Sequence, residues 1–79
     1  MRIKKTIITD LNLATTLTTL RYKLIELDRT NRKRVGFVFE YNQKVEQSIT
    51  DYWNDEIKLP AQTLFNNQKN LKSRIYSDA

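Results

Sequence analysis

Cysteine and histidine are both missing from this 79-residue chain. Their absence excludes disulfides, thiolate nucleophiles, imidazole bases and every zinc site built on cysteine or histidine. A single glycine and a single proline leave little room for linkers or low-complexity tracts. The sequence also has no glycine-rich phosphate loop, no nucleophile–base pair and no metal-ligand cluster. We therefore expect a protein that is not an enzyme and that binds no cofactor and no metal.

Long hydrophobic runs are missing as well. The first ten residues have the basic opening of a signal peptide but not its apolar core, and no segment approaches the length of a membrane span. We therefore expect a cytoplasmic protein, of a cell or of an infected host, without a membrane partner. With 39% hydrophobic and 29% charged residues, the chain is expected to form one small folded domain over residues 1–79.

Positive charge is in excess and is unevenly distributed. The net charge is +5, and residues 1–36 carry nine lysines and arginines against three acids. Residues 37–79 carry five against six. A basic half of this kind favours encounter with nucleic acid or with an acidic protein.

The first elements that we expect are a short strand and a helix. Residues 3–9 are rich in β-branched side chains, which favours a strand at the edge of a sheet. Asp10 has the chemistry of a helix N-cap. Four apolar residues then recur at helical spacing: Leu13, Ala14, Leu17 and Leu20. Leucine and threonine also alternate here, as in a strand, and threonine is a poor helix former, but we favour the helix.

Residues 22–41 are expected to form a β-hairpin. Five apolar residues should share its buried face: Ile25, Leu27, Val35, Phe37 and Phe39. Because paired residues share a face, their numbers must sum to an even value such as 62 or 64, and the loop must have an odd number of residues. One such loop is 31–33, with Asn31 or a neighbour at positive φ. The same parity places four charged residues together on the outer face: Glu26, Asp28, Arg32 and Arg34.

Two further helices are expected in the second half of the chain. In residues 43–54 four side chains share one face: Val45, Ile49, Tyr52 and Trp53. Pro60 suits the first turn of a last helix, which runs to about residue 76. Its inward stripe should comprise Ala61, Leu64, Phe65, Gln68, Leu71 and Ile75. The fold expected is α+β, in the order β-α-β-β-α-α, with a small antiparallel sheet that contains a β-hairpin and is packed by three helices.

Four short segments resemble a known family by their order and spacing. They are TDLNLA at the start of the first helix, GFVFE on the second hairpin strand, DYWND at the end of the second helix and LKSRIYS near the end of the chain. Together they resemble the small prokaryotic and phage-associated proteins grouped as domain of unknown function 5659. The resemblance covers nearly the whole chain and implies this fold and a mobile-element origin, but no activity and no catalytic residues. Members often have a glycine between the first helix and the hairpin, where this chain has Arg-Tyr-Lys at 21–23.

The main candidate for a binding surface is the basic tip of the hairpin. Four residues carry its charge: Arg29, Arg32, Lys33 and Arg34. Lys4 and Lys5 extend this surface if the first strand lies beside the hairpin. Such a surface suits the phosphates of a nucleic acid. The alternative is a solvated turn that serves solubility and edge protection, with Arg34 facing Asp28 or Thr30 across the strands.

Two aromatic pairs have both a functional and a structural interpretation. Tyr52 and Trp53 have the chemistry to stack on bases or to anchor a protein partner, but their helical spacing favours the core. Phe37 and Phe39 are spaced as in a strand that stacks RNA bases. We expect them in the core as well, against the apolar residues of the preceding strand.

Basic residues also gather near the end of the last helix: Lys69, Lys72 and Arg74. They suit the negative end of the helix dipole, and a second role would be to widen the basic surface. The function that we expect is a small binding or adaptor module that contacts nucleic acid or an acidic protein through the basic hairpin face. The alternative is a structural or protein-interaction subunit that forms a homodimer through a helical face and has no nucleic-acid role.

Overall fold

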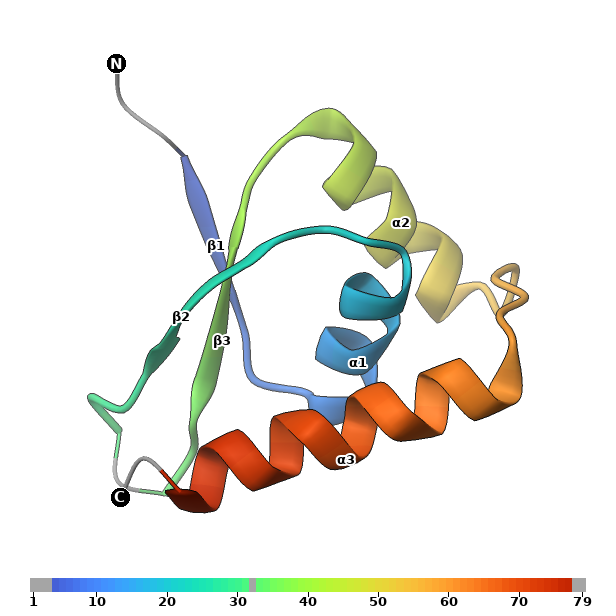
Figure 1. Cartoon of the computed structure of the whole chain (residues 1–79). Helices are drawn as coiled ribbons and strands as arrows, with labels where there is room; N and C mark the ends of the chain where they lie inside the picture. Colours follow the sequence, from blue (N-terminus) through green and yellow to red (C-terminus); the bar gives the residue numbers. More distant parts are fainter. Residues whose placement is uncertain (1–3, 32, 78–79) are drawn as a thin grey trace.

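The computed structural model describes residues 4–31 and 33–77. Six elements follow one another: β1 (Lys5–Ile8), α1 (Leu11–Thr19), β2 (Leu24–Asp28), β3 (Gly36–Glu40), α2 (Gln43–Trp53) and α3 (Ala61–Ser77). The expected order β-α-β-β-α-α is confirmed. Figure 1 shows the strands on one side of the molecule and the three helices packed on the other. Within these described residues, no helix covers the opposite face of the sheet (Figure 1).

The three strands form one antiparallel sheet in the order β1-β3-β2. β1 is therefore an edge strand, as expected, and β3 is central. β1 pairs with β3 from Lys5 opposite Glu40 to Ile8 opposite Phe37. Because β3 leaves the hairpin loop at its first residue, the Lys5 end of β1 is the end farther from that loop.

The register of the hairpin confirms the parity argument next to the loop. Leu27 lies opposite Phe37 and Asp28 opposite Gly36, so that both pairs sum to 64. The connection between the strands comprises residues 29–35. Its length is odd, as expected, although it is longer than a three-residue turn.

Farther from the loop the register shifts, between Leu24 and Glu26. An extra residue in one strand changes which side chains face inward. Leu24 consequently packs against the core together with Leu27, while Ile25 is half-buried outside that cluster. The expectation that Ile25 belongs to the core was wrong, because the hydrophobic pattern alone does not reveal the irregularity.

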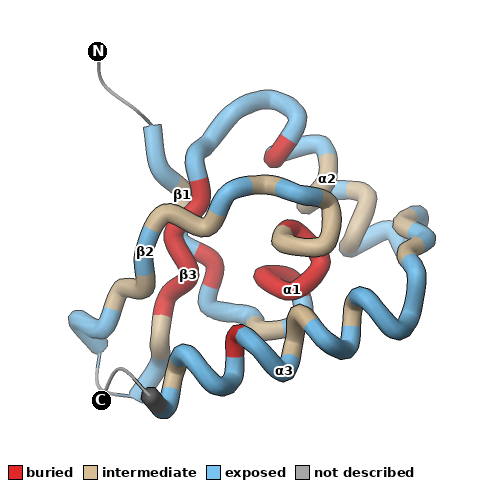
Figure 2. Tube along the Cα trace, viewed as in Figure 1, coloured by how far each residue is buried: buried red, intermediate tan, exposed pale blue. Residues whose placement is uncertain are grey.

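The core lies between the sheet and α1, where Figure 2 shows most of the residues coloured as buried. Its buried residues are Ile8, Leu13, Ala14, Leu17, Phe37, Phe39, Val45 and Leu71. Phe37 and Phe39 are almost fully buried, which confirms their assignment to the core. Three of the four residues expected on the inward face of α1 are buried: Leu13, Ala14 and Leu17. Leu20 was wrongly included, because it is the C-cap of the helix and is half-buried outside this cluster.

Hydrogen bonds explain how α1 accommodates four threonines. Its N-cap is Asp10, as expected, whose side chain accepts from the Leu13 N–H at 3.1 Å. Each threonine hydroxyl donates to the carbonyl four residues earlier, over 2.7 to 2.9 Å. Thr15 and Thr16 are therefore buried with their hydroxyls satisfied. The alternation of leucine and threonine thus belongs to a helix and not to a strand.

α2 lies on the opposite side of α1 from α3 (Figure 1). Val45 is its buried residue, and Ile49 and Tyr52 are half-buried against the core. Trp53 was expected beside them but is 63% exposed. One residue is a rotation of about 100° on a helix, so the side chain that follows Tyr52 points past the edge of the narrow face that α2 buries.

α3 follows Pro60, whose carbonyl accepts from the Leu64 N–H. Leu71 is buried, and three other members of the expected stripe are half-buried: Leu64, Gln68 and Ile75. The Gln68 amide donates to Oδ1 of Asn12 on α1 at 2.7 Å, which accounts for a polar residue in an inward stripe. Two members were wrongly placed in the stripe, because Ala61 is exposed and Phe65 is 64% exposed.

Candidate nucleic-acid interface

Arg29 fastens the hairpin loop to the C-terminal end of α3. Its Nη2 donates to the carbonyl oxygens of Arg74 and Ile75, each at 3.0 Å. The last carbonyls of a helix have no partner within the helix, and a cation there also opposes the negative end of the helix dipole. Figure 1 shows the loop and this end of α3 meeting at one corner of the molecule. Arg29 thus joins segments that are 45 residues apart in sequence.

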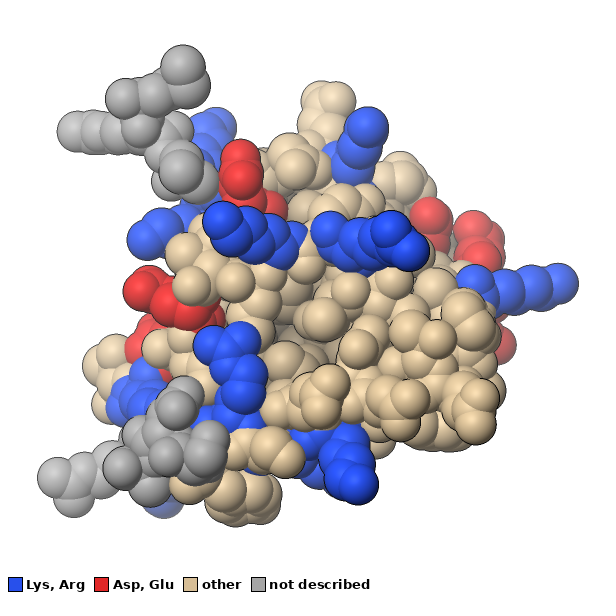
Figure 3. All heavy atoms as spheres, viewed as in Figure 1, with Lys and Arg blue, Asp and Glu red and all other residues tan. Residues whose placement is uncertain are grey.

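Two basic segments meet at this corner. Exposed lysine and arginine side chains come from the loop and from the second half of α3. We call these residues the basic end. They are Arg29, Lys33 and Arg34 of the loop and Lys69, Lys72 and Arg74 of α3. Figure 3 shows lysine and arginine side chains along the upper part of this face and at its left and lower left, near the corner where α3 ends, with aspartate and glutamate on its left and right sides.

The chain around α3 is free of acids. No aspartate or glutamate occurs from residue 57 to residue 77, whereas four lysines and arginines do. Several other exposed residues of α3 are amides: Gln62, Asn66 and Asn70. Cations bind phosphates, and amides form hydrogen bonds with base edges and with the sugar–phosphate backbone. The exposed side of the second half of α3 therefore combines cations with an amide, a chemistry that suits a polyanion.

Asp28 stands at the base of the loop and orders its first residues. Its Oδ1 accepts from the hydroxyl of Thr30 at 2.5 Å and from the Thr30 N–H at 2.9 Å. These two hydrogen bonds lower the pKa of Asp28. Asp28 also lines a hollow of about 520 Å³ on the outer face of the sheet, and Arg34 and Gly36 line the same hollow. The expected neighbourhood of Asp28 and Arg34 is therefore observed.

Asn31 organises the middle of the loop. Its Oδ1 accepts from the Lys33 N–H at 2.9 Å, and its carbonyl accepts from the Arg34 N–H at 3.3 Å. Asn31 itself does not adopt the positive φ considered for it. Arg32, the fourth cation predicted for the tip, lies outside the described residues.

Lys4 and Lys5 do not join the basic end. β1 lies beside β3, as the prediction required, but Lys5 is at the end of β1 away from the loop, about 10 Å along the strand from Ile8. Lys5 Nζ lies 3.8 Å from Oε1 of Glu26, across the central strand, and both side chains are about half exposed. An exposed pair of this kind contributes a few tenths of a kcal/mol, or about 1 at most.

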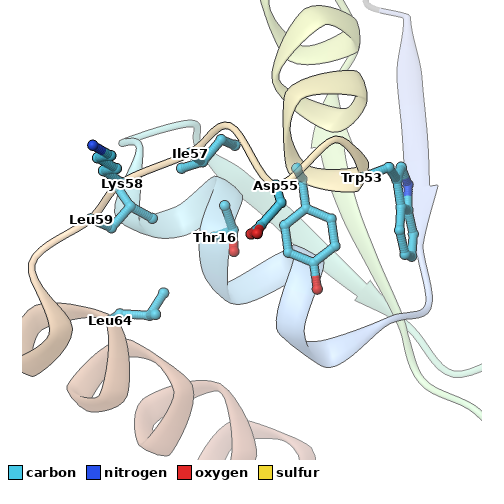
Figure 4. Close-up of a pocket in the computed structure, with 8 residues that line it drawn as sticks. Thr16, Trp53, Asp55, Ile57, Lys58, Leu59 and Leu64 are labelled. Atoms are coloured by element: carbon cyan, nitrogen blue, oxygen red, sulfur yellow. The ribbon is translucent and has the colours of Figure 1, made fainter.

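A second feature, which the sequence interpretation missed, is a groove of about 610 Å³ between α2 and α3 (Figure 4). Its lining residues are Thr16, Tyr52, Trp53, Asp55, Ile57, Lys58, Leu59 and Leu64. The rings of Tyr52 and Trp53 meet edge to face, with centroids 5.0 Å apart. Burial, and secondarily the Asp10 carboxylate, raises the pKa of Tyr52. The sequence feature that could have indicated such a surface is that α2 and α3 carry more large apolar residues than one narrow inward face buries, Trp53 and Phe65 being exposed.

The described residues contain no cluster of three or more acidic side chains placed to hold a metal ion. Over the same residues, no helix combines the length and the hydropathy that crossing a bilayer requires. No curated protein and no solved structure matches the chain significantly. The profile of the family described as Domain of unknown function (DUF5659) matches residues 4–77. Since this match covers almost the whole chain, the protein belongs to the DUF5659 family.

Proposed function

We propose that this protein is a small, non-enzymatic nucleic-acid-binding module, phage- or mobile-element-encoded, and that the basic end is its contact surface. The observation that carries the proposal is the pair of hydrogen bonds from Arg29 to the carbonyls of Arg74 and Ile75. They bring two separate basic segments into one surface. A solvated hairpin tip that served only solubility would not need to be fastened to a distant helix.

The shape of α3 supports a duplex as the ligand. The helix has 17 residues, or about 25 Å of length, and an α-helix fits the major groove of B-form DNA. In the proposed complex, lysines on α3 and in the adjacent loop contact phosphates on either side of such a groove. The amides on the exposed side of α3 then face the base edges.

Binding is the activity to test, across a salt series and on three ligands: mixed-sequence duplex DNA, single-stranded DNA and RNA. The test variant is Lys33→Ala/Lys69→Ala/Lys72→Ala. The matched control is Lys4→Ala/Lys23→Ala/Lys44→Ala, which removes the same charge from exposed positions outside the basic end. Fluorescence anisotropy measures the affinity of each protein.

Each lost phosphate contact should reduce the slope of log K against log salt by about 0.9, so the test variant should lose about 2 to 3 units of slope. The control should lose much less. Equal losses in the two variants would assign the attraction to net charge alone. Absence of binding to all three ligands, with binding to an acidic polypeptide, would instead assign the basic end to an acidic protein and contradict the proposal.

A further inference from the structure

Two large aromatic side chains stand exposed at the groove between α2 and α3. Trp53, at the end of α2, is 63% exposed, and Phe65, in the first half of α3, is 64% exposed. Clustered apolar side chains beside a groove mark contact surfaces more often than isolated exposed residues do. The described part of the chain leaves more than half of each of these two side chains uncovered.

The groove exists because α2 and α3 pack on opposite sides of α1. Thr16 of α1 forms its floor, and Tyr52 and Leu64 line its two sides. A second hollow, of about 240 Å³, shares these three residues and adds Phe65. The two hollows therefore adjoin each other, and we refer to them together as the groove. Figure 4 shows Leu59 and Ile57 at its upper side, and Lys58 extending away towards solvent.

We propose that this groove is the contact surface between two copies of the chain, related by a two-fold axis. In such an interface each copy supplies both the projecting and the receiving element. This surface holds both: the rings of Trp53 and Phe65 project beside a concave, partly apolar groove. The aromatic residues of one copy fill the groove of the other.

Charge at the groove favours a second copy over a partner of one sign. Asp55 and Lys58 both line the groove, and within the described residues neither forms an ion pair. A two-fold axis between them brings Asp55 of each copy towards Lys58 of the other. An acidic or a basic partner would meet one favourable and one unfavourable charge. The basic end lies towards the other end of α3, so the dimer does not depend on the proposed nucleic-acid function.

Sedimentation equilibrium without nucleic acid tests the proposal, from about 1 μM to 1 mM, the range of weak to moderate association. Wild type should be a dimer in the upper part of this range. Phe65→Glu and Trp53→Glu should each raise the dimer Kd at least about 30-fold, as expected for central aromatic residues of an interface. Both positions are exposed, so circular dichroism should show unchanged folding.

The matched control is Tyr76→Glu, which places the same charge at an aromatic residue of α3 that is 79% exposed and does not line the groove. Its dimer Kd should stay within about 3-fold of wild type, the range of neutral surface substitutions. A wild-type chain that is monomeric throughout overturns the proposal. A dimer that survives both groove substitutions overturns it too, because the interface then lies elsewhere.

A mixing experiment separates pairing from loss of stability. Asp55→Lys and Lys58→Glu should each be monomeric, because each places like charges at both symmetric contacts. A mixture of the two variants should form a heterodimer, because both contacts are then complementary. Destabilisation alone cannot produce this recovery. A mixture that remains monomeric overturns the proposed pairing.

Discussion

At the residue scale, Arg21 carries the backbone conformation that ends α1. Its φ is 73°, in the left-handed region that favours glycine. The N–H groups of Arg21 and Tyr22 donate to the carbonyls of Thr18 and Leu17, which is the Schellman arrangement. Arg21 lies in the segment where the family resemblance expects a glycine. The departure of this chain from that pattern therefore has an energetic cost at a single residue.

Replacing Arg21 by glycine should stabilise the protein. Relief of the left-handed strain, less the greater entropy of glycine in the unfolded chain, should raise the free energy of unfolding by about 0.5 to 1 kcal/mol. Urea denaturation measures the change. The control is Lys23→Gly, at an exposed position without positive φ, which should be neutral or destabilising. Equal stabilisation by both substitutions would contradict the role of the Arg21 backbone.

At the element scale, local sequence patterns predicted the six helices and strands. They did not predict the burial of individual side chains or the strand register, because both depend on how neighbouring elements pack. N-cap chemistry at Asp10 and helical periodicity located α1, because both act within a few residues. The helical period says which side chains share a face, but not how wide a face the neighbouring elements cover. Trp53 and Phe65 were misplaced for this reason, since α2 and α3 each bury a narrow stripe against α1. The register shift beside Ile25 left no trace in the hydrophobic pattern.

The basic end, too, was predictable only in part: the sequence reveals its residues but not that they come together. Sequence identified the cations of the loop and those of α3 as two separate groups, because charge is visible residue by residue. Their union depends on hydrogen bonds between Arg29 and carbonyls 45 and 46 residues away, which no local pattern contains. The groove likewise arises from the packing angles of three helices and not from any one segment.

Replacing Arg29 by alanine should release the loop from α3. We expect the free energy of unfolding to fall by about 1 kcal/mol, because two helix-end carbonyls lose a charged donor at an exposed site. Hydrogen exchange should quicken in the loop and in the last turn of α3. Arg34→Ala removes the same charge from the same loop and should leave exchange at the end of α3 unchanged. The same exchange pattern in both variants would show that Arg29 does not fasten the loop.

At the scale of the whole molecule, the fold separates two surfaces of different character. The basic end gathers cations at one corner, whereas acids cluster at the C-terminal end of α2: Asp51, Asp55 and Glu56. The groove lies at this second region, near the first half of α3. The net charge of +5 is thus concentrated away from the groove, whose own charged lining residues are one acid and one lysine, Asp55 and Lys58.

The pH dependence of stability should follow from groups at the two extremes. With no histidine and no cysteine, no side chain has an ordinary pKa between about 5 and 8, so the free energy of unfolding should be flat there. Hydrogen bonds from Thr30 lower the pKa of Asp28, so its contribution is complete above the ordinary value of 3.8 and is lost as pH falls through the lowered folded value. In the Asp28→Asn variant, the free energy of unfolding should therefore fall less steeply as the pH is lowered below 3.8.

At alkaline pH the free energy of unfolding should fall as the pH rises, and the residue responsible is Tyr52. Burial and the Asp10 carboxylate raise the pKa of Tyr52, so the unfolded chain ionises first and stability is lost as pH rises from the ordinary value of 10.0 through the raised folded value. Tyr52→Phe should shallow the loss of stability in urea titrations above pH 10, relative to Tyr76→Phe at a site that is 79% exposed. The hydrogen bond from Tyr41 to Glu46 raises the pKa of Tyr41 as well, so the Tyr52→Phe variant should still lose some stability at alkaline pH. If Tyr52→Phe and Tyr76→Phe lost stability equally as the pH rose above 10, ionisation of the Tyr52 hydroxyl would not be coupled to folding. The half-buried position of Tyr52 beside the groove would then be contradicted.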